Sequence, residues 1–550
     1  MNFKENESAT KLRGGYYTPL PIASFLAKWV LANKPKHVLE PSCGDGAFIH
    51  AFNVKHKSKI QFTGIELLEE EADKARQSVT SNKQLDVEVI NDDFLDWGIH
   101  QLQAGKQFDA VVGNPPYIRY QYLEEQDQKL SEQIFARYKL TFTKHTNAWV
   151  PFVIASIGLL APGGRLAMVI PSELLHVLHA GSLRKFLLTE CSRILMIDPN
   201  ELLFENALQG TVLLMVSKKI DASQDSEGVA VIAAPNNDFL YTDPEKIFST
   251  APYVSGDILN GKWMKVLLDK EEIEVFERVR KLPTIHKFKD IAKVDVGIVT
   301  GANKFFLVDN RTVEKYQLEN YAKPMFGRSG HCPGVIYSQS VHDRNSEEGM
   351  PINFISFDKT DFNDLPSGAQ SYIREGESQN LHTRYKCRIR KPWYSVPSVY
   401  NTNLGMLKRA HNYPRLILNS ASAYTTDTAY RITTAMNPEV LVYCFINSLT
   451  ALTAEMEGRH YGGGVLELVP SEIEKVLIPI VETDGMSLKA LDYEISNSHD
   501  PDTLFLKQDA KVLTAAGLSD DDCRVIQRAW RHIRSRRHRL LGSISEKLEN

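Results

Sequence analysis

Short apolar runs, most of them followed by glycine or by acidic and amide side chains, alternate with longer amphipathic stretches through roughly the first 220 residues. Such runs, bounded by turn residues, are typical of buried strands, and the stretches between them have the spacing of helices. Strands that alternate with helices predict a parallel α/β sheet. The strands that we expect are residues 37–40, 60–65, 87–90 and 108–113.

The first three of these expected strands end in residues that can bind a nucleoside. Residues 41–46 form a glycine-containing turn, which lets a ligand approach the backbone. Glu66 follows about 20 residues later, where an acidic side chain can hold the hydroxyls of a ribose. Asp93 and Phe94 offer a carboxylate for an exocyclic amine and a ring to stack on adenine. A nucleoside site is therefore predicted at the carboxyl edge of the sheet.

The fourth expected strand ends at residues 114–117, which read Asn-Pro-Pro-Tyr. Two prolines hold the flanking residues in a rigid, non-helical turn. There an amide oxygen and a backbone carbonyl can accept from an NH2 group while the aromatic ring stacks on a planar base. Taken singly, this turn, Glu66, Asp93 and Cys43 are about as well explained as ordinary turn, cap or core residues. Their order along the chain favours a site for an amine on a flat heterocycle.

These motifs resemble those of the gamma-class (Taq-type) adenine-N6 DNA methyltransferases, the modification enzymes of type II restriction-modification systems. Residues 15–19, 145–152 and 160–166 extend the resemblance. It implies an α/β chain with an N-terminal Rossmann-like S-adenosylmethionine-dependent methyltransferase domain, a doubly wound mixed sheet, and a C-terminal mixed α+β target-recognition domain. The polar stretch at residues 221–228 separates them. The expected segments are residues 1–235, residues 236–515 and a basic C-terminal helical segment, residues 516–550.

The resemblance also implies roles for individual residues. Asn114 and the Pro115 carbonyl would accept hydrogen bonds from the N6 amino group of the target adenine, and Tyr117 would stack on that base. Phe204 is the candidate for a second stacking ring. The residues expected to surround S-adenosylmethionine are Thr18, Glu40, Pro41, Cys43, Gly44, Gly46, Glu66, Asp93, Phe94 and Asn114.

The chemistry of adenine N6 explains why such a site needs two acceptors. The lone pair of N6 is delocalised into the ring, so the enzyme must localise it and aim it at the sulfonium methyl group. The base must also leave the duplex, and aromatic rings replace the stacking that it loses. Cytosine-C5 enzymes need a cysteine nucleophile, and no cysteine stands next to a proline at this site.

Composition adds limits to this picture. A chain of 550 residues predicts two or three domains, and its 43% hydrophobic and 24% charged residues are those of an ordinary globular protein. No apolar stretch reaches membrane-span length and no secretory signal opens the sequence, so a cytoplasmic protein is expected. The six cysteines are scattered, which indicates neither a disulfide framework nor a zinc site. No metal is expected.

Two basic segments stand out against a net charge of −4. Residues 382–394 interleave cations with aromatic residues, and read as a strand they would present the cations on one face to DNA. The basic run at residues 524–539 is explained about equally well as a solvated helix face and as a DNA contact. A helix is predicted at 271–280, and residues 296–307 read as strand, glycine turn and strand. With residues 459–465 and 469–471 they resemble target-recognition domains of this methyltransferase class.

Four functions remain open at this point. A stand-alone modification methyltransferase is favoured, which acts on double-stranded DNA as a monomer and has no membrane contact. Its functional partner would be a cognate restriction endonuclease that shares the target sequence, with no complex between the two implied. A fused restriction and modification enzyme is an alternative, although the catalytic motifs begin within the first 20 residues and leave no room for a nuclease ahead of them. Methyltransferases for protein glutamine or RNA also use Asn-Pro-Pro-Tyr. A non-enzymatic DNA-binding protein is disfavoured because every expected catalytic position is filled.

Overall fold

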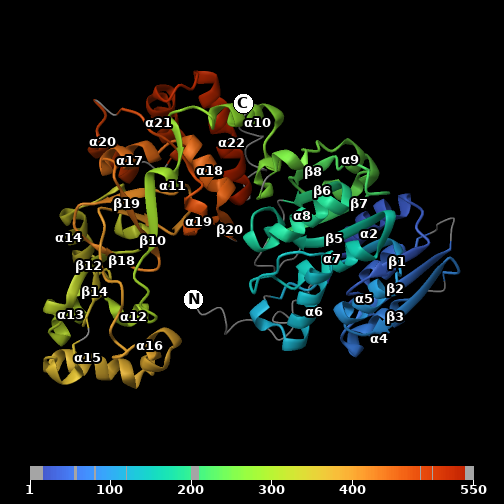
Figure 1. Ribbon diagram of the computed structural model, residues 1–550, viewed down its shortest axis with the longest axis horizontal. Helices are drawn as coiled ribbons and strands as arrows, with labels where there is room; N and C mark the ends of the chain where they lie inside the picture. The colour runs from blue at the N-terminus through green and yellow to red at the C-terminus, as the bar shows by residue number, and fades with distance from the viewer. Residues whose placement is uncertain are drawn as a thin grey trace. The chain divides into compact units, whose positions relative to one another are not determined.

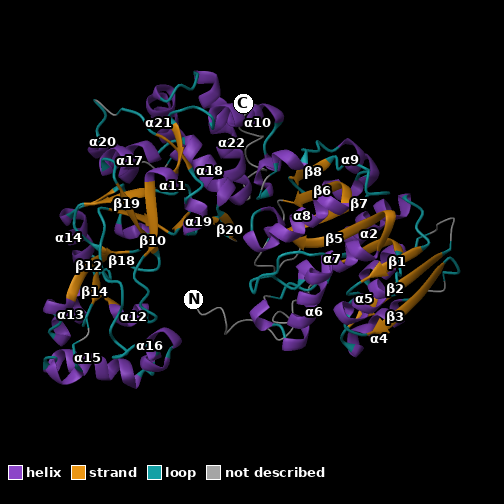
Figure 2. Cartoon of the chain, viewed as in Figure 1, coloured by secondary structure: helices purple, strands orange, loops and turns teal. Residues whose placement is uncertain are grey.

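The computed structural model describes residues 17–54, 59–79, 82–118, 120–199, 210–259, 261–358, 360–461, 463–482, 485–497 and 500–538. These residues form two compact units, one within Met1–Leu268 and the other within Asp269–His538 (Figure 1). Helices and strands alternate in the first unit, whereas the second combines helices with several small sheets (Figure 2).

All four strands predicted from the apolar runs are confirmed in the first unit. The strands of this unit are β1 His37–Glu40, β2 Ile60–Glu66, β3 Leu85–Asn91, β4 Phe108–Gly113, β5 Leu160–Pro171, β6 Cys191–Pro199, β7 Thr211–Lys218 and β8 Gly228–Ala234. Its α-helices are α2 Leu20–Ala32, α3 Ala47–Phe52, α4 Glu69–Ser78, α5 Phe94–Gln103, α6 Glu125–Arg137, α7 Trp149–Leu159, α8 Gly181–Glu190 and α9 Pro244–Thr250.

The eight strands form one mixed sheet in the order β3-β2-β1-β4-β5-β7-β6-β8. Strands β3, β2, β1, β4 and β5 are parallel neighbours, and β7 runs antiparallel to both β5 and β6. After β1 the chain adds β2 and β3 on one side and then returns to place β4 on the other. This reversal of strand order makes the carboxyl edge of β1 and β4 the switch point, where ligands bind in open α/β sheets.

Both faces of this sheet are covered, as its almost uninterrupted apolar strands require. Helices α2, α3 and α9 contribute Phe25, Trp29, Phe48 and Phe248 to a core that also contains alternate residues of the central strands. The intervening strand residues, such as Val111, are also buried. Helices α5 and α7 pack against each other, with Gly98 of α5 close to α7. The doubly wound mixed sheet predicted from the sequence is thus confirmed.

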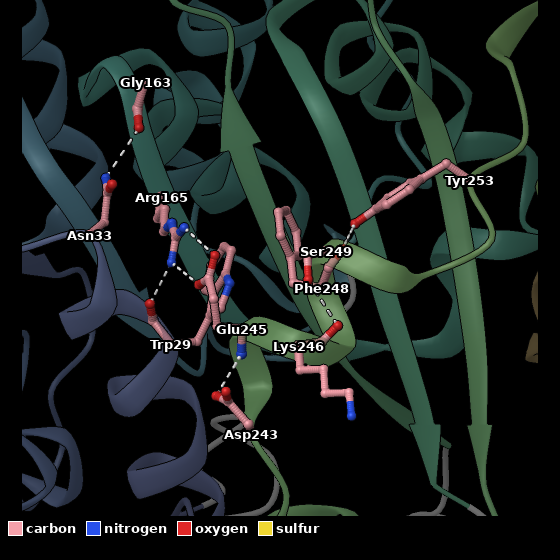
Figure 3. A network of polar contacts seen from close by, with 10 residues as sticks. All are labelled: Trp29, Asn33, Gly163, Arg165, Asp243, Glu245, Lys246, Phe248, Ser249 and Tyr253. Atoms are coloured by element: carbon pink, nitrogen blue, oxygen red, sulfur yellow. Dashed lines mark hydrogen bonds and ion pairs between the residues drawn. The ribbon is translucent and has the colours of Figure 1, made fainter.

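A polar network attaches α9 to the first unit (Figure 3). Arg165 of β5 donates to both carboxylate oxygens of Glu245, at 2.6 and 3.0 Å, and to the Trp29 carbonyl at 2.7 Å. The hydroxyl of Tyr253 donates to the Phe248 carbonyl at 2.7 Å. These contacts hold residues up to Tyr253 in the first unit, which extends to Leu268, whereas the sequence placed the boundary at residue 235.

The second unit begins with a helix that has a complete capping box at Asp269 and Glu272, one residue from the predicted start. Its helices are α10 Lys270–Val279, α11 Phe288–Ile291, α12 Asn303–Phe306, α13 Asn310–Tyr316, α14 Gln339–Glu347, α15 Ser367–Ser378, α16 Tyr385–Arg388, α17 Pro438–Phe445, α18 Ser448–Glu457, α19 Pro470–Ile473, α20 Leu488–Asn497, α21 Pro501–Ala515 and α22 Asp520–His538.

The strands of the second unit are short and form four separate sheets. The five-stranded sheet consists of β10 Ala292–Val296, β19 Ala429–Thr434, β15 Leu404–Leu407, β17 Leu416–Asn419 and β13 Ile336–Tyr337. The four-stranded sheet consists of β11 Leu307–Val308, β14 Asn353–Ile355, β12 Ala322–Phe326 and β18 Tyr424–Thr425. The three-stranded sheet consists of β16 Arg409–Ala410, β21 Val465–Glu467 and β20 Arg459–Tyr461. The two-stranded sheet consists of β22 Leu477–Pro479 and β9 Ile285–Lys287. The predicted mixed α+β architecture is confirmed.

Two local predictions for this unit are wrong. The first strand expected within residues 296–307 ends at Val296, with only an isolated bridge at Ile298 beyond it. In place of the second strand lies the short helix α12, which precedes the two-residue β11, because Phe305 and Phe306 pack side by side into one core rather than on opposite faces of a sheet. The segment 382–394 is not a strand either. It contains a 3-10 turn and the helical turn α16, which buries Cys387.

The basic run 524–539 falls largely within α22, and four of its arginines pair with acidic residues on other elements of the same unit. Arg528 pairs with three carboxylates, those of Asp269, Glu271 and Glu272. Arg531 and Arg534 pair with Asp502, and Arg537 with Glu455. Helix α22 thus belongs to the second unit by contact, although the sequence suggested a separate segment from residue 516. Its charge stabilises packing within the unit.

Within the described ranges, no helix combines the length and apolar character that crossing a bilayer requires. The same residues contain no group of three or more His, Cys, Asp or Glu side chains placed to hold a metal ion. All six cysteines are free, and five of them are buried.

Candidate active site at the carboxyl edge of the sheet

The carboxyl ends of β3, β2, β1 and β4 lie side by side because these strands are parallel neighbours. Glu40 of β1 pairs in register with Gly64 of β2, and Glu66 of β2 pairs with Asn91 of β3. Backbone bonds join the loops beyond them: the Cys43 amide donates to the Ile65 carbonyl at 2.9 Å. The described residues that the sequence placed in a cofactor site therefore lie along one edge.

The turn after β1 requires glycine at two positions. Gly44 and Gly46 have φ angles of +51° and +91°, which other residues rarely adopt. A Cβ atom on Gly46 would lie 2.4 Å from the hydroxyl oxygen of Ser78 in α4. The ring of Tyr17 lies 3.9 Å from the corresponding position on Gly44, so the segment that leads into α2 borders the turn. Thr18 is next to it and buried.

Cys43 contributes its backbone to this turn, because its side chain points into the core. The thiol is 4% exposed and lies against Gly64, where a Cβ atom would be 3.1 Å from the sulfur. Burial raises the pKa of the Cys43 thiol, and the charges of Glu40 and Glu66 raise it further. The thiol is therefore protonated and inert at neutral pH.

Glu66 connects the glycine turn to the end of β2. Its two carboxylate oxygens accept from the backbone amides of Gly44, at 2.9 Å, and Leu68, at 3.0 Å. Each oxygen has a second lone pair, and the side chain is only half-buried, so a diol can still be bound. The arrangement fits the predicted contact with the ribose hydroxyls, which stays a prediction.

We expect the Glu66→Ala variant to bind S-adenosylmethionine about 10-fold to 100-fold more weakly, since hydrogen bonds to a charged group contribute about 1.5–3 kcal/mol. Isothermal titration calorimetry of the purified protein measures this change. The exposed Glu69 of α4 provides a matched control, because Glu69→Ala removes the same charge close by. Equal affinities for the Glu66→Ala and Glu69→Ala variants would contradict the role assigned to Glu66.

Asp93 and Phe94 follow β3 but differ in how far they are accessible. Asp93 caps α5, accepting from the Asp96 amide at 2.9 Å, and burial raises the pKa of its half-buried carboxyl. Phe94 is 2% exposed, and its ring lies 5.0 Å from that of Phe152 in α7. The Asp93 carboxylate thus borders the edge of the sheet, while the Phe94 ring is part of the core beneath it.

Glu40 is the most unusual charge at this edge. It is 2% exposed, and its Oε2 atom has no hydrogen-bond partner among the described residues. Burial raises the pKa of Glu40 well above its ordinary value, and the neighbouring charges of Glu66 and Asp45 add to this effect. A buried carboxylate without a counter-charge is unfavourable. An ammonium group bound beside Glu40 would compensate that charge and would itself be stabilised by it.

The turn formed by Asn114, Pro115, Pro116 and Tyr117 is fastened to the strands on both sides. The hydroxyl of Ser42, in the glycine turn, donates to the Asn114 carbonyl at 3.0 Å. The hydroxyl of Tyr117 donates to the carbonyl of Val169 in β5 at 3.0 Å. Pro115 is buried, whereas Asn114 and Tyr117 are half-buried. These bonds place the Asn-Pro-Pro-Tyr turn directly beside the turn that follows β1.

Phe204 lies outside the described residues. The residues on either side of that gap are placed: Pro199 ends β6, and the Ser172 amide donates to the Gly210 carbonyl at 2.9 Å, next to β7. Ser42 and Tyr17 border the glycine turn of the candidate site, and the sequence reasoning did not single them out. A serine in a turn carries no signal of its own, and Tyr17 could have been found only from its place beside Thr18.

The sheet order β3-β2-β1-β4-β5-β7-β6, with β7 antiparallel to its neighbours, defines the class I methyltransferase fold. Two family models match the chain: the Eco57I restriction-modification methylase over residues 22–204, and the C-terminal domain of the type II methyltransferase M.Eco57I over residues 260–513. The chain therefore belongs to the Eco57I family of type II restriction-modification methylases.

Individual relatives agree with this assignment. The type II methyltransferase M.AccI of Acinetobacter calcoaceticus is 24% identical over 485 residues, which cover 84% of each chain. M.HindII of Haemophilus influenzae is 23% identical over 330 residues, or 57% of this chain and 59% of that one. The restriction enzyme and methyltransferase RM.Eco57I of Escherichia coli is 24% identical over 323 residues, 50% of this chain but 31% of its own.

The solved structure of the type IIL restriction-modification enzyme MmeI in complex with DNA has a related fold. Its TM-score is 0.55 at 10% identity, over 96% of this chain and 75% of that one. Family membership implies S-adenosylmethionine as the cofactor, and the residues present fit it. The buried Glu40, whose Oε2 atom has no hydrogen-bond partner among the described residues, suits the methionine ammonium group, and the carboxylate of the half-buried Glu66 suits the ribose.

Proposed function

We propose that this protein methylates adenine N6 of a flipped base at a specific sequence in double-stranded DNA, as the modification half of a restriction-modification system. The single observation that carries the proposal is the bond from Ser42 to the Asn114 carbonyl. It joins the glycine turn of the cofactor site to a rigid Asn-Pro-Pro-Tyr turn. The relatives named as type II methyltransferases support the activity on DNA.

Bound S-adenosylmethionine supplies an electrophilic methyl group on a sulfonium centre. The chain's own residues make the amine more nucleophilic. The Asn114 side-chain oxygen and the Pro115 carbonyl accept hydrogen bonds from the N6 amino group, and these bonds localise the nitrogen lone pair on N6. The bond from Tyr117 to Val169 holds the Tyr117 ring at the edge of the sheet, where it stacks on the extruded base. Positioning by these fixed groups lowers the entropy cost of the transfer.

Sequencing of modified bases in DNA from cells that express the protein tests this proposal. We expect N6-methyladenine at one recurring sequence and no mark in cells without the gene. N4-methylcytosine at that sequence would overturn the choice of adenine, and unmodified DNA would overturn the function as a whole. Methyl transfer to protein or RNA, without transfer to DNA, would support the alternative of a protein-glutamine or RNA methyltransferase.

The cognate endonuclease is part of the proposal, and so is a monomeric state. A separate nuclease that cuts the unmethylated sequence should spare DNA carrying the mark. The fused alternative predicts instead that the purified protein itself cleaves unmethylated DNA when magnesium is added, as the name of RM.Eco57I would suggest. Sedimentation of the purified protein decides the oligomeric state.

A further inference from the structure

A long stretch of the second unit carries only positive charge. Between Glu377 and Asp427 the chain has eight lysine and arginine residues and no Asp or Glu. Four of the eight are held within the unit: Lys408 and Arg409 pair with Glu467, while Arg390 and Arg415 donate to backbone carbonyls. The other four lie in or next to α16 and are Arg384, Lys386, Arg388 and Lys391.

Helix α16 is held rigidly although it is only one turn long. Arg390 donates to the carbonyls of Thr300 and Val299, at 2.7 and 2.6 Å, and so ties the segment to the loop that follows β10. Cys387 is fully buried in the core of this part of the unit. The backbone of Gly301 lies so close that a Cβ atom there would be 2.7 Å from the Cβ of Lys386. These inward contacts hold the backbone of the segment in place, so the side chains on its outward face keep a defined position.

That outward face combines free cations with exposed apolar side chains. Arg384, Lys386, Arg388 and Lys391 are exposed and have no ion-pair partner among the described residues. Tyr385 is 63% exposed and Ile389 is 60% exposed, so two large apolar side chains stand among these cations at the surface. The cations of Lys386 and Arg388 lie 5.6 and 5.7 Å from the centre of the Tyr385 ring.

We infer that this α16 surface, formed by Arg384, Tyr385, Lys386, Arg388, Ile389 and Lys391, binds duplex DNA. The inference rests on the proposed function. The cations neutralise phosphates, and Tyr385 and Ile389 contact the sugars and base edges between them. The contrast with α22, where the cations are paired with carboxylates of the same unit, makes the α16 surface the better match for a polyanion.

The chemistry of this surface favours DNA over an acidic protein. An aromatic ring flanked by cations is the arrangement that stacks on or wedges beside nucleic-acid bases while the charges follow the backbone. Trp393 and Tyr394, the other aromatic residues of the segment, do not take part. Trp393 packs 5.2 Å from Phe305, and Tyr394 is 2% exposed.

Binding of a fluorescent random-sequence duplex to the full-length protein, measured between 50 and 200 mM salt, tests the inference. The variant R384Q/K386Q/R388Q should bind more weakly and show a shallower salt dependence, by roughly 0.9 in log–log slope for each phosphate that the variant no longer neutralises. The variant Y385A should weaken binding at least about fivefold with the slope unchanged. The matched control K281Q/K489Q/K511Q removes three exposed cations of the same unit on other elements. Equal slopes for the two triple variants would overturn the inference.

Acylation of lysines in the unaltered protein provides a second measurement that needs no variant. Bound duplex should protect Lys386 and Lys391 more than Lys489 and Lys511, and absence of that difference would also overturn the inference. Methyl incorporation by the unaltered protein is measured in parallel. A protein that binds DNA through this surface but transfers no methyl group contradicts the proposed function only, whereas a methylating protein without this protection contradicts the α16 surface only.

Discussion

Replacing Asn114 by alanine is expected to slow methyl transfer by at least about 100-fold while S-adenosylmethionine still binds. The alanine removes an acceptor for the N6 hydrogens, and loss of one positioned polar group at a reacting centre slows catalysis by about 100-fold to 1,000-fold. The Ser42 hydroxyl bonds the backbone carbonyl of Asn114 and not its side chain, so the turn itself survives the change. The bonds that hold Glu66 in the cofactor site are likewise untouched.

Single-turnover transfer of a labelled methyl group, with calorimetry for the cofactor, separates these two effects. The variant Asn114→Asp retains acceptor oxygens at the same place and should keep more activity than Asn114→Ala. Asn33, an exposed residue that donates to the Gly163 carbonyl at 3.3 Å, gives a control in which the same substitution leaves the rate unchanged. Wild-type rates for Asn114→Ala would refute the assignment of the Asn-Pro-Pro-Tyr turn as the catalytic turn.

The carboxyl-edge site could be predicted because its signals are local. An apolar run such as residues 108–113, followed at once by a proline-locked turn, identifies both a strand and its end without knowledge of its neighbours. Parallel pairing then places all four strand ends together. For this reason the four strands and the meeting of their carboxyl ends were predicted correctly from a single sequence, while the roles of the residues at that edge stay predictions.

Side-chain orientation within that edge could not be predicted, since it depends on what packs beneath. Cys43 and Phe94 stand at motif positions in the sequence, yet both side chains point into the core. Gly64 leaves room for the Cys43 sulfur, and the Phe94 ring packs against that of Phe152. The link from Ser42 to Asn114 joins residues 72 positions apart. Only the folded sheet brings them together.

The second unit was harder to predict for a different reason. Its strands are as short as two residues and pair over long distances in sequence, as Ile336 does with Leu418. Alternation of charged and apolar residues in 382–394 suggested a strand, but a buried Cys387 at the centre of one helical turn gives the same pattern over so few residues. Tertiary packing decides between the two.

The arginines of α22 lead to the prediction with the largest effect on stability. Arg537 and Glu455 are both fully buried and form a bidentate pair, with nitrogen to oxygen distances of 2.6 and 2.9 Å. Burial alone would raise the pKa of Glu455, but the charge of Arg537 and the hydrogen bonds from His460 and Arg537 lower it to about 2. The stability that this shift contributes is present above the unfolded pKa of about 4.3 and is lost as the pH falls through about 2.

We expect Glu455→Gln to destabilise the second unit by about 3–5 kcal/mol, because it leaves the Arg537 guanidinium buried without a counter-charge. The double variant Glu455→Met/Arg537→Met should recover part of this loss, since no uncompensated charge remains. Hydrogen exchange in peptides from α18 and α22 measures the change where the pair lies. Arg524, whose guanidinium meets Asp521 at the exposed surface, serves as the control, and Arg524→Ala should change exchange little. If Glu455→Gln matched that control, the α22 charges would not hold the unit together, and a direct contact with DNA would again be the better explanation of this basic run.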